Sequence, residues 1–505
     1  MAPGVPRPAT LRPVPLRELA AGRGELIGVG ADGVHVTGIT SGTAFVEPGD
    51  LFAALPGRTV HGAAYVASAI GAGAVAVLTD AAGRALVSPG VPAILVEDAR
   101  VALGPVSSAV YGDPSATLRV LGVTGTSGKT TTTFLMRAGL IAAGRVPGLI
   151  GTVATMIGSD EIKTGFTTPE APEVHALLAV MRERGVTDVA MEVSSHALAL
   201  GRVGGVTFRV GAFTNLSEDH LDFHPTMDDY FDAKARLFSQ SERAVVVADD
   251  VWGRRMAAVA GADVTVTTAE SDGTWHVADV VENADGSTSF RALGPTFDLR
   301  MGCAIPGRYN VANALLALAM LAEDGLAPSE TAAAISTATV PGRMERIDAG
   351  QPFLAVVDYS HKPAAVDGAL RALRPLTPGK LIIVLGCGGD RDRGKRPHMG
   401  EIAARGAELL IVTDDNPRSE VADDIRKAML DGALSVPESE RAEVREIGDR
   451  ADAIGAAVQA ATVGDTVLIA GKGHETGQEV AGVVHPFDDR DVLREALEGL
   501  EARQR

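Results

Sequence analysis

Cysteine, aromatic residues and long apolar runs are all scarce in this chain of 505 residues. It has two cysteines, Cys303 and Cys387, in apolar stretches without the paired spacing of a zinc site. That usage argues against a disulfide framework and predicts buried free thiols in a reducing compartment. The proline-rich N-terminus lacks the apolar core of a signal peptide and is expected to be a flexible lead-in. No apolar run reaches membrane-spanning length, so we expect a cytoplasmic protein without a membrane span.

Positive charge is in short supply as well, since 64 acidic residues outnumber 46 basic ones and give a formal net charge of −18. This balance argues against nucleic acid or an anionic membrane as the main partner. It does not exclude a local basic pocket for an anionic substrate. The hydrophobic share of 46% and the length are sufficient for two to four domains with real cores.

Strands and helices alternate along most of the chain, which predicts an α/β protein. We interpret residues 1–116 as a small α/β domain and residues 117–340 as a central domain with a parallel sheet. The latter opens with the buried strand "LRVLGV". Residues 341–505 repeat the pattern with "FLAVVDY", "LIIVLGC", "ELLIVTDD" and "TVLIAG", and predict a Rossmann-like domain.

The stretch "GVTGTSGKTTTT" lies between that buried strand and an apolar helix. Gly125, Gly128, Lys129 and Thr130 form the core of a phosphate loop, in which backbone N–H groups and a helix N-terminus surround phosphate oxygens. Lys129 would reach the β- and γ-phosphates, and the Thr130 hydroxyl would face Mg²⁺. Val123 stands where the usual motif has its first glycine. An ordinary glycine turn is the alternative, but the order of strand, loop and helix favours ATP or GTP.

Three further residues are candidates for metal chemistry. Glu192 ends the strand "VAMEV", and His220 follows the strand "FRVGAF"; ligands in open α/β sheets bind at such carboxyl ends. Taken alone, Glu192 could be a surface or capping acid and His220 a hydrogen-bonded core imidazole. Lys234 falls in the apolar stripe of the helix predicted in "TMDDYFDAKARLF", where snorkelling of the side chain is the simple explanation.

Ten ordered strings extend the pattern through the chain. They are "TGTSGKTTTT", "TTPEAPE", "MEVSSHAL", "NLSEDHLDFH", "DYFDAKARLF", "GRYNVANALLA", "PGRMERID", "GCGGDRDRGKRP", "TDDNPR" and "GKGHE". With them, the chain from about Val36 onward resembles the Mur ligases, ATP-dependent enzymes that add amino acids to the peptidoglycan precursor. Within the family it is most similar to the branch that adds the third residue. The resemblance implies a three-domain fold, two Mg²⁺ ions and amide-bond formation through an acyl phosphate.

The resemblance also implies residue roles. Lys234 would be carbamylated by CO₂ and would ligate Mg²⁺ together with Thr130, Glu192 and His220, and the catalytic set would be Lys129, Glu192, His220 and Lys234. The ATP contacts would be Gly125, Thr126, Ser127, Gly128, Lys129, Thr130, Thr131, Asn310, Arg343, Asp358 and His361. The UDP-MurNAc-L-Ala-D-Glu contacts would be Ser41, Thr43, Arg58, Thr59, Val60, Thr167, Thr168, Ser194 and Arg202. Burial is compatible with carbamylation, which needs a neutral amine.

The third substrate implied is meso-diaminopimelate. Its pocket would comprise Arg391, Asp415, Asn416, Pro417, Arg418, Gly471 and Glu475. Arg418 offers a planar partner for the second carboxylate, which lysine lacks, and Glu475 could hold the distal ammonium. A solvated arginine in a proline-containing turn is the alternative explanation of "DNPR".

Departures from the family pattern leave other substrates open. Gly42, Thr43 and Ala44 stand where an Asp-Ser-Arg triplet is usual. A paralogue that joins another carboxylate and amino acid, a lysine-adding enzyme and a non-catalytic ATP-binding regulator are the alternatives. The retention of Glu192, His220 and Lys234 argues against the regulator. A monomer is the expected state.

Overall fold

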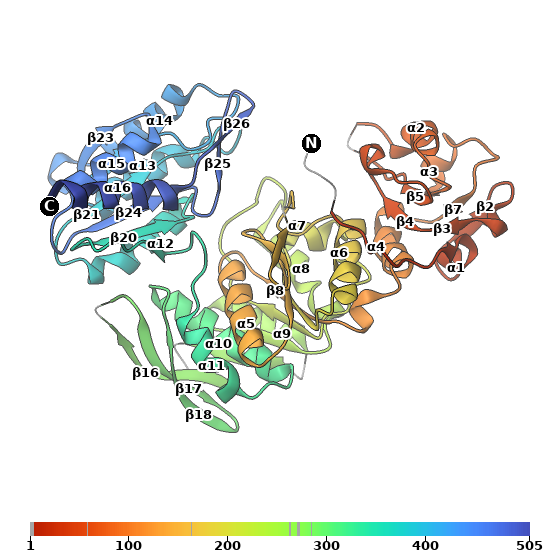
Figure 1. The fold of residues 1–505 in the computed structure, drawn as a ribbon, viewed down its shortest axis with the longest axis horizontal. Helices are drawn as coiled ribbons and strands as arrows, with labels where there is room; N and C mark the ends of the chain where they lie inside the picture. The colour runs from red at the N-terminus through yellow and green to blue at the C-terminus, as the bar shows by residue number, and fades with distance from the viewer. Residues whose placement is uncertain are drawn as a thin grey trace. The chain divides into compact units, whose positions relative to one another are not determined.

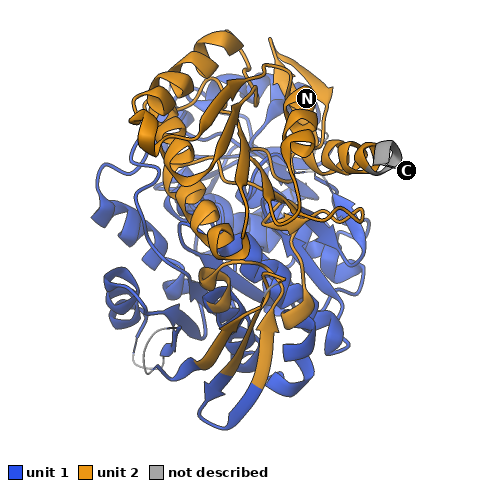
Figure 2. Ribbon diagram, turned by 90° about the vertical axis from the view of Figure 1, so that its left-hand side faces the viewer, with its two compact units in different colours: residues 1–277, 292–299, 312–335 blue, residues 278–291, 300–311, 336–505 orange. Residues whose placement is uncertain are grey.

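The computed structural model describes residues 5–57, 59–162, 164–261, 264–269, 273–283 and 285–504, with side chains to residue 500. Three main sheets carry the helices (Figure 1). Contacts divide the chain into two compact units (Figure 2). The first comprises residues 1–277, 292–299 and 312–335, and the second comprises residues 278–291, 300–311 and 336–505. The α/β class predicted from the alternating pattern is confirmed.

The N-terminal sheet has five strands in the order β2-β7-β6-β5-β4. Their bounds are β2 Glu25–Ile27, β4 Gly38–Thr40, β5 Asp50–Ala53, β6 Ala76–Thr79 and β7 Ala93–Leu95. The associated helices are α1 Leu16–Ala20, α2 Val66–Gly71, α3 Ala81–Arg84 and α4 Ala99–Val110, and β1 Val14–Pro15 pairs with β3 His35–Val36. Strands β4 to β7 run parallel, while β2 is antiparallel to β7.

The expected flexible lead-in is wrong from Val5 onward. The Arg7 guanidinium donates to both carboxylate oxygens of the buried Asp50, at 2.6 and 3.0 Å. Further along, the backbone N–H groups of Ala9 and Thr10 donate to Glu183 at 2.9 Å. These charged contacts fix the segment to the N-terminal sheet and to helix α6 (Ala171–Glu183).

The central sheet has the order β11-β10-β9-β12-β8-β13-β14-β15-β16-β17-β18. Its strands are β8 Arg119–Thr124, β9 Pro147–Ile150, β10 Thr155–Ile157, β11 Asp160–Ile162, β12 Asp188–Glu192, β13 Val210–Phe213, β14 Ala244–Val247, β15 Val264–Thr268, β16 Trp275–Glu282, β17 Thr288–Gly294 and β18 Phe297–Cys303. Its remaining helices are α5 Lys129–Ala142, α7 Ser195–Ala199, α8 Met227–Ala235, α9 Val251–Ala260, α10 Arg308–Glu323 and α11 Pro328–Thr337. The buried run "LRVLGV" becomes β8, a central strand with parallel neighbours on both sides.

The C-terminal sheet has six strands in the order β19-β20-β24-β21-β22-β23. They are β19 Glu345–Arg346, β20 Leu354–Asp358, β21 Leu381–Leu385, β22 Leu409–Val412, β23 Glu443–Glu446 and β24 Thr466–Ala470, and the hairpin β25 Gly477–Val480 and β26 Val483–Pro486 follows. The helices are α12 Pro363–Leu373, α13 Lys395–Gly406, α14 Ala422–Leu434, α15 Arg450–Ala460 and α16 Asp489–Gln504. All four strands predicted here are present, and they pair in parallel as a Rossmann-like sheet requires.

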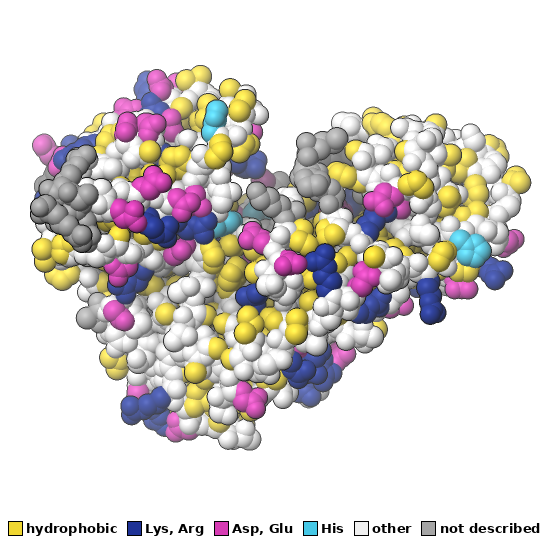
Figure 3. Space-filling model, in the orientation of Figure 1, with side chains coloured by type: hydrophobic (Ala, Val, Ile, Leu, Met, Phe, Trp, Pro, Cys, Tyr) yellow, Lys and Arg dark blue, Asp and Glu magenta, His cyan; other side chains and the backbone are white. Residues whose placement is uncertain are grey.

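Two expectations from composition can be checked directly. Cys303 and Cys387 are free and buried, and burial raises the pKa of each thiol to about 11. Among the described residues, no helix has the length and apolar character needed to span a bilayer. On the described surface of the face in Figure 3, acidic and basic side chains are interspersed.

His175 makes the stability of the first unit depend on pH. Its imidazole is fully buried in α6, with Nε2 2.9 Å from the Gly204 carbonyl oxygen, and burial lowers its pKa to about 4. The unfolded chain therefore takes up this proton at a higher pH than the folded one. Above pH ~6.5 we expect no effect of this difference on the free energy of unfolding. As the pH falls from ~6.5 to ~4, the free energy of unfolding should decrease by about 3 kcal/mol.

Thermal unfolding of His175→Gln at pH 7 and pH 5 checks this expectation. The variant should lose part of the acid sensitivity of the first unit. His35→Gln, at an exposed site, is the control and should retain it. An unchanged slope in His175→Gln would show that other groups cause the acid sensitivity.

Candidate active site

Three adjacent strands of the central sheet end at the same edge. β12 and β13 flank β8 in parallel, with Glu192 opposite Val123 and Phe213 opposite Thr124. The phosphate loop, the candidate acid and the segment that carries His220 therefore leave the sheet side by side. This is the edge where open α/β sheets bind ligands.

The phosphate loop is held in place by the segment that follows β13. Gly125 has φ +146°, and a Cβ there would overlap Thr214 Oγ1, so only glycine fits. The Thr214 hydroxyl donates to the Ser127 carbonyl at 2.6 Å, and the Thr126 N–H donates to Asn215 O at 2.9 Å. Lys129, Thr130 and Thr131 form the first turn of α5, as the motif predicts.

Two lysines converge on one carbonyl oxygen of this loop. Lys129 Nζ donates to Gly125 O at 2.9 Å, and Lys234 Nζ donates to the same oxygen at 2.8 Å. The Lys234 side chain is 1% exposed and lies 4.3 Å from the centroid of the Tyr230 ring. The snorkelling explanation is therefore wrong, because the amine points into the site. Two positive charges on one acceptor repel each other, and a bound anion at either lysine would relieve the repulsion.

Helix α8 holds Lys234 in this position. The Thr226 hydroxyl accepts from Asp229 N at 3.1 Å, and the Asp229 carboxylate accepts from Thr226 N, which together form a capping box. Tyr230 and Phe231 are buried as the helical stripe predicts. The packed, capped helix fixes the direction of the lysine stem.

Glu192 is a buried carboxylate with neutral partners. It is 1% exposed and accepts from Thr152 N at 2.9 Å and from the Thr152 hydroxyl at 3.1 Å. Thr152 also contacts the Thr167 hydroxyl at 2.9 Å. A buried carboxylate usually has a cation nearby, and within the described ranges no lysine, arginine or histidine forms an ion pair with Glu192. The site therefore fits a divalent cation.

His220 lies among other aromatic and imidazole rings that sequence reasoning missed. It adopts φ +54°, with Nε2 3.2 Å from Asp219 Oδ2 and its ring 4.8 Å from that of His196. His224 is buried, with its ring 5.0 Å from that of Tyr230. Burial lowers the pKa of both His196 and His224. The motif strings "SSH" and "DFH" contained both histidines, but nothing in them indicated that the rings cluster.

A cavity of ≈ 400 Å³ opens beside the N-terminal sheet. Ser41, Thr43 and Val60 line it, together with Arg100 and Glu170. Of the other candidates, Thr59 is exposed, and Arg58 lies outside the described residues. The cavity is therefore present although residues 42–44 differ from the usual family pattern.

Glu170 connects this cavity to the central sheet. Its Oε2 is 2.8 Å from Arg100 Nη1, and its Oε1 is 2.9 Å from Arg202 Nε. Arg202 also donates to Thr168 O at 3.1 Å, while the Thr168 hydroxyl donates to Glu192 O at 2.9 Å. Ser194 caps α7 and donates its N–H to Thr168 Oγ1 at 3.2 Å. Thr168, Ser194 and Arg202 are thus brought together at the end of β12, while Thr167 is connected to the Glu192 carboxylate through Thr152.

Four predicted ATP contacts belong to the second unit. Asn310 is buried in the first turn of α10, where its amide donates to Pro306 O at 2.7 Å, so it is not the helix cap. The Arg343 guanidinium lies 4.5 Å from the Tyr359 ring, and Asp358 accepts from Met344 N at 2.7 Å. Burial lowers the pKa of His361 to about 4.

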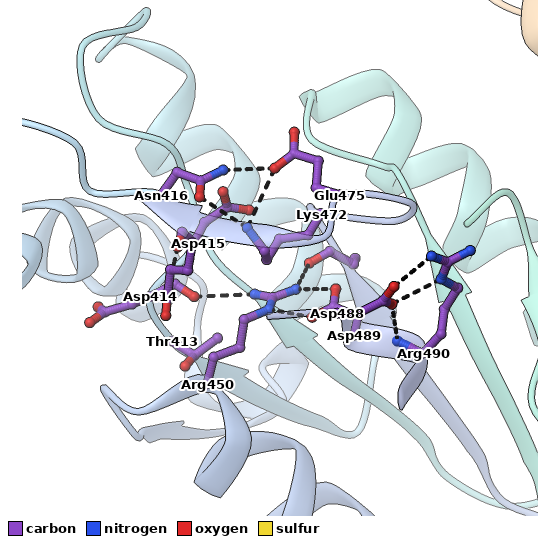
Figure 4. Close-up of polar contacts among 12 residues, drawn as sticks. Thr413, Asp414, Asp415, Asn416, Arg450, Lys472, Glu475, Asp488, Asp489 and Arg490 are labelled. Carbon is purple, nitrogen blue, oxygen red and sulfur yellow. Dashed lines mark hydrogen bonds and ion pairs between the residues drawn. The ribbon is translucent and has the colours of Figure 1, made fainter. Parts of the chain in front are cut away.

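Several residues predicted for the amino-acid pocket lie at the carboxyl ends of β22 and β24 (Figure 4). Asp415, Asn416 and Pro417 are buried, and the Asn416 amide donates to Glu475 Oε2 at 2.7 Å. Gly471 has φ +117°, and a Cβ there would approach Asp415 Oδ2 to 2.6 Å. Asp415, Asn416, Gly471 and Glu475 therefore lie close together.

The two arginines of this pocket differ in placement. Arg418 adopts φ +53° and donates to Gly389 O at 2.6 Å, with Nε 3.4 Å from Glu479 Oε2. A single parallel β-bridge between Arg418 and Val480 connects the loop to β25. Arg391 is exposed and donates to the neighbouring Asp390 carbonyl at 3.3 Å. Within the part of the chain that the structure describes, Arg391 makes no hydrogen bond or ion pair with the other residues predicted for the amino-acid pocket.

A buried ion pair supports the floor of the pocket (Figure 4). Arg450 and Asp489 both have fully buried side chains, joined by two hydrogen bonds of 2.7 Å. Arg450 also donates to Ala470 O at 3.0 Å and Asp414 O at 3.2 Å, which fixes the ends of both strands. Neither residue was among the predicted site residues.

Comparison with known proteins identifies the family. Residues 35–111 match the model "Mur ligase family, catalytic domain", residues 123–321 match "Mur ligase middle domain", and residues 342–473 match "Mur ligase, glutamate ligase domain". A relative from Streptomyces coelicolor is 52% identical over 98% of both chains and is named UDP-N-acetylmuramoyl-L-alanyl-D-glutamate–2,6-diaminopimelate ligase. The chain belongs to the Mur ligase family. A Corynebacterium glutamicum relative of the same name is 51% identical over 93% of both chains.

Solved Mur ligases have the same three-domain fold. The structure of a UDP-N-acetylmuramoyl-L-alanyl-D-glutamate–2,6-diaminopimelate ligase aligns with a TM-score of 0.72 and 30% identity over 97% of this chain and all of that one. MurF from Acinetobacter baumannii, at 17% identity, aligns over 91% of this chain and 96% of its own with a TM-score of 0.65. Among the described residues, no group of three or more His, Cys, Asp or Glu side chains has metal-binding geometry. The ligand set predicted for this Mur ligase is of a different kind, with a hydroxyl and a modified lysine.

Gly125 offers a direct test of the phosphate loop. Because a Cβ would overlap Thr214, Gly125→Ala should displace the loop and weaken ATP binding by about 100-fold or more, the cost of several lost backbone hydrogen bonds. Isothermal titration with ATP and Mg²⁺ measures the effect. Gly71→Ala is the control, since its Cβ would meet nothing within 4 Å. Wild-type affinity in Gly125→Ala would place the nucleotide elsewhere.

Proposed function

We propose that the protein is the ATP-dependent ligase that joins meso-diaminopimelate to UDP-MurNAc-L-Ala-D-Glu in the cytoplasm, acting as a monomer. The observation that carries the proposal is the convergence of Lys129 and Lys234 on Gly125 at the edge where Glu192 is buried. The names of the relatives that are 51–52% identical support the choice of substrates. The proposed domains are residues 1–116 for UDP-MurNAc, 117–340 for ATP and 341–505 for the amino acid.

The reaction has two steps. An oxygen of the D-Glu γ-carboxylate forms a bond to the γ-phosphorus of ATP, the bond to the β–γ bridging oxygen breaks, and ADP leaves. The neutral amine of diaminopimelate then attacks the acyl carbon, phosphate leaves, and the nitrogen loses a proton. Both partners of the first step are anions, so Lys129 would act by neutralising the γ-phosphate while the phosphate loop orients it.

Mg²⁺ would be held by Thr130, Glu192, His220 and a carbamate on Lys234. When bound, it supplies positive charge that lowers the repulsion between carboxylate and phosphate. A carbamate would turn Lys234 from a second cation beside Lys129 into an anion, which removes their mutual repulsion. Thr152 holds the Glu192 carboxylate in a fixed orientation toward this site.

Substrate positioning would be divided between the two remaining pockets. Ser41, Thr43 and Val60 line the cavity proposed for the uridine nucleotide, while Thr168 and Arg202 lie on the path from it to Glu192. In the second unit, Arg418 would pair with the distal carboxylate of diaminopimelate, and Glu475 would accept its distal ammonium.

Substrate discrimination is the first test. Phosphate release with ATP and UDP-MurNAc-L-Ala-D-Glu should be strong with meso-diaminopimelate and weak with L-lysine, because lysine lacks the distal carboxylate with which Arg418 would pair. Arg418→Met should lower kcat/KM for diaminopimelate by about 100-fold or more and abolish most of the preference. Arg445→Met, at an exposed arginine of β23, is the control.

Two results would contradict the assignment. Better turnover with lysine would remove the role given to Arg418 and favour a lysine-adding enzyme. ATP binding without turnover on either amino acid would contradict the assignment of UDP-MurNAc-L-Ala-D-Glu as the substrate. Other carboxylates would then be tested.

Lys234 provides an independent test of the carbamate. Lys234→Ala should lower turnover by about 100- to 1,000-fold, because it removes the anion that offsets charge at the site. Acetate or formate should restore part of the activity by supplying a small carboxylate in the space of the lost side chain. Asp232→Ala, on the exposed face of the same helix, should remain active. An equally active Lys234→Ala without added carboxylate would exclude the role.

A further inference from the structure

A fully buried lysine that no substrate assignment uses lies at the base of the amino-acid pocket. Lys472 follows β24 and is 0% exposed. Its ammonium donates to Gly477 O at 2.6 Å and Asn416 Oδ1 at 3.0 Å, and lies 3.4 Å from Glu475 Oε2 (Figure 4). Lysines are almost never fully buried unless they are paired, so this position needs a reason.

The contacts of Lys472 fix the orientation of the Asn416 amide. Asn416 Oδ1 accepts from the Lys472 ammonium and from Glu479 N, the latter at 2.9 Å. Both partners are obligatory donors, so the oxygen must face them and the NH₂ group must face the other way. That NH₂ group donates to Glu475 Oε2 at 2.7 Å.

The same contacts leave one oxygen of Glu475 for a ligand. Oε2 faces both the Asn416 amide and Lys472. Among the residues that the structure describes, Oε1 takes no hydrogen bond, and the side chain is 32% exposed. A carboxylate held by one oxygen, with the other partly open, is suited to accept an ammonium group.

We propose that Lys472 is a positioning residue for the amino-acid substrate: it orients Asn416 and Glu475 so that Glu475 Oε1 receives the distal ammonium. This inference rests on the proposed function. Lys472 acts through two other side chains and does not itself touch the substrate.

Charge reinforces the geometry. Burial raises the pKa of Glu475, Asp415 raises it further, and Lys472 lowers it. The charged and titratable groups that interact with Glu475 include Lys472, Asp415, Arg450 and Tyr359. Lys472 is a cation in hydrogen-bond contact with Glu475, and it lowers the pKa of this carboxyl, which favours the ionised form.

A double-mutant cycle in the full-length protein tests the inference. Lys472→Met should raise the KM for diaminopimelate about 10- to 100-fold, the loss expected for one hydrogen bond to a charged group. The KM values for ATP and UDP-MurNAc-L-Ala-D-Glu should be unchanged. In a Glu475→Gln background, Lys472→Met should change the amino-acid KM by less than about 3-fold, because the two residues act as one unit. Lys427→Met, at an exposed lysine of α14, is the control.

The pH profile separates positioning from a merely structural role. The acid limb of kcat/KM for diaminopimelate should move to higher pH in Lys472→Met. Lys472→Gln, which keeps a donor but loses the charge, should show the same shift with a smaller rise in KM. Additive losses in the cycle, an equal rise in all three KM values or an unmoved acid limb would each overturn the proposal.

A measurement without turnover keeps this inference distinct from the proposed function. The Glu475 carboxyl can be titrated by ¹³C NMR in the ligand-free protein, with Glu475→Gln identifying its signal. Its pKa should be higher in Lys472→Met than in the wild type, and equal values would overturn the inference. If the wild type fails to use diaminopimelate while this pKa difference is present, the proposed substrate is wrong. The electrostatic coupling between Lys472 and Glu475 would still be supported.

Discussion

The carbonyl oxygen of Gly125 is the point on which the active site of the first unit depends. Its position requires the positive φ of Gly125, and the Thr214 hydroxyl occupies the space that a side chain would need. Lys129 from α5 and Lys234 from α8 both donate to it. One backbone group therefore sets the distance between the nucleotide lysine and the candidate metal lysine, although they are 105 positions apart in the chain. Any movement of the loop displaces both amines together.

Much of this arrangement could be predicted because it is encoded locally. Continuous apolar runs predicted the buried parallel strands, and the glycine pattern predicted the turn from β8 into α5. The apolar neighbours of Lys234 at helical spacing placed its stem in the core, and the resemblance to Mur ligases supplied a reason for the amine. Gly471 and Asp415 were found together because two separate motifs follow strand ends at one edge of a sheet.

The rest depends on contacts between distant segments, which leave no local pattern. Glu170 pairs with Arg100 and Arg202, which lie 70 and 32 positions away, and Glu170 and Arg100 each resemble an ordinary surface charge in their own segments. The lysine of "GKGHE" likewise gives no sign that it is buried against an asparagine 56 residues earlier. For Arg391 the motif predicted a residue of the amino-acid pocket, but the structure places its side chain in solvent.

The contacts of the first dozen residues have a practical consequence. Arg7 compensates a fully buried carboxylate in β5, and the backbone of Ala9 and Thr10 occupies the carboxylate at the end of α6. Trimming the chain to its first regular strand would leave Asp50 buried without its cation, which is among the more damaging changes a protein can suffer. Recombinant versions therefore need to keep the segment that contains Arg7, Ala9 and Thr10, and a start site chosen at the first recognisable family motif would yield a weakened protein.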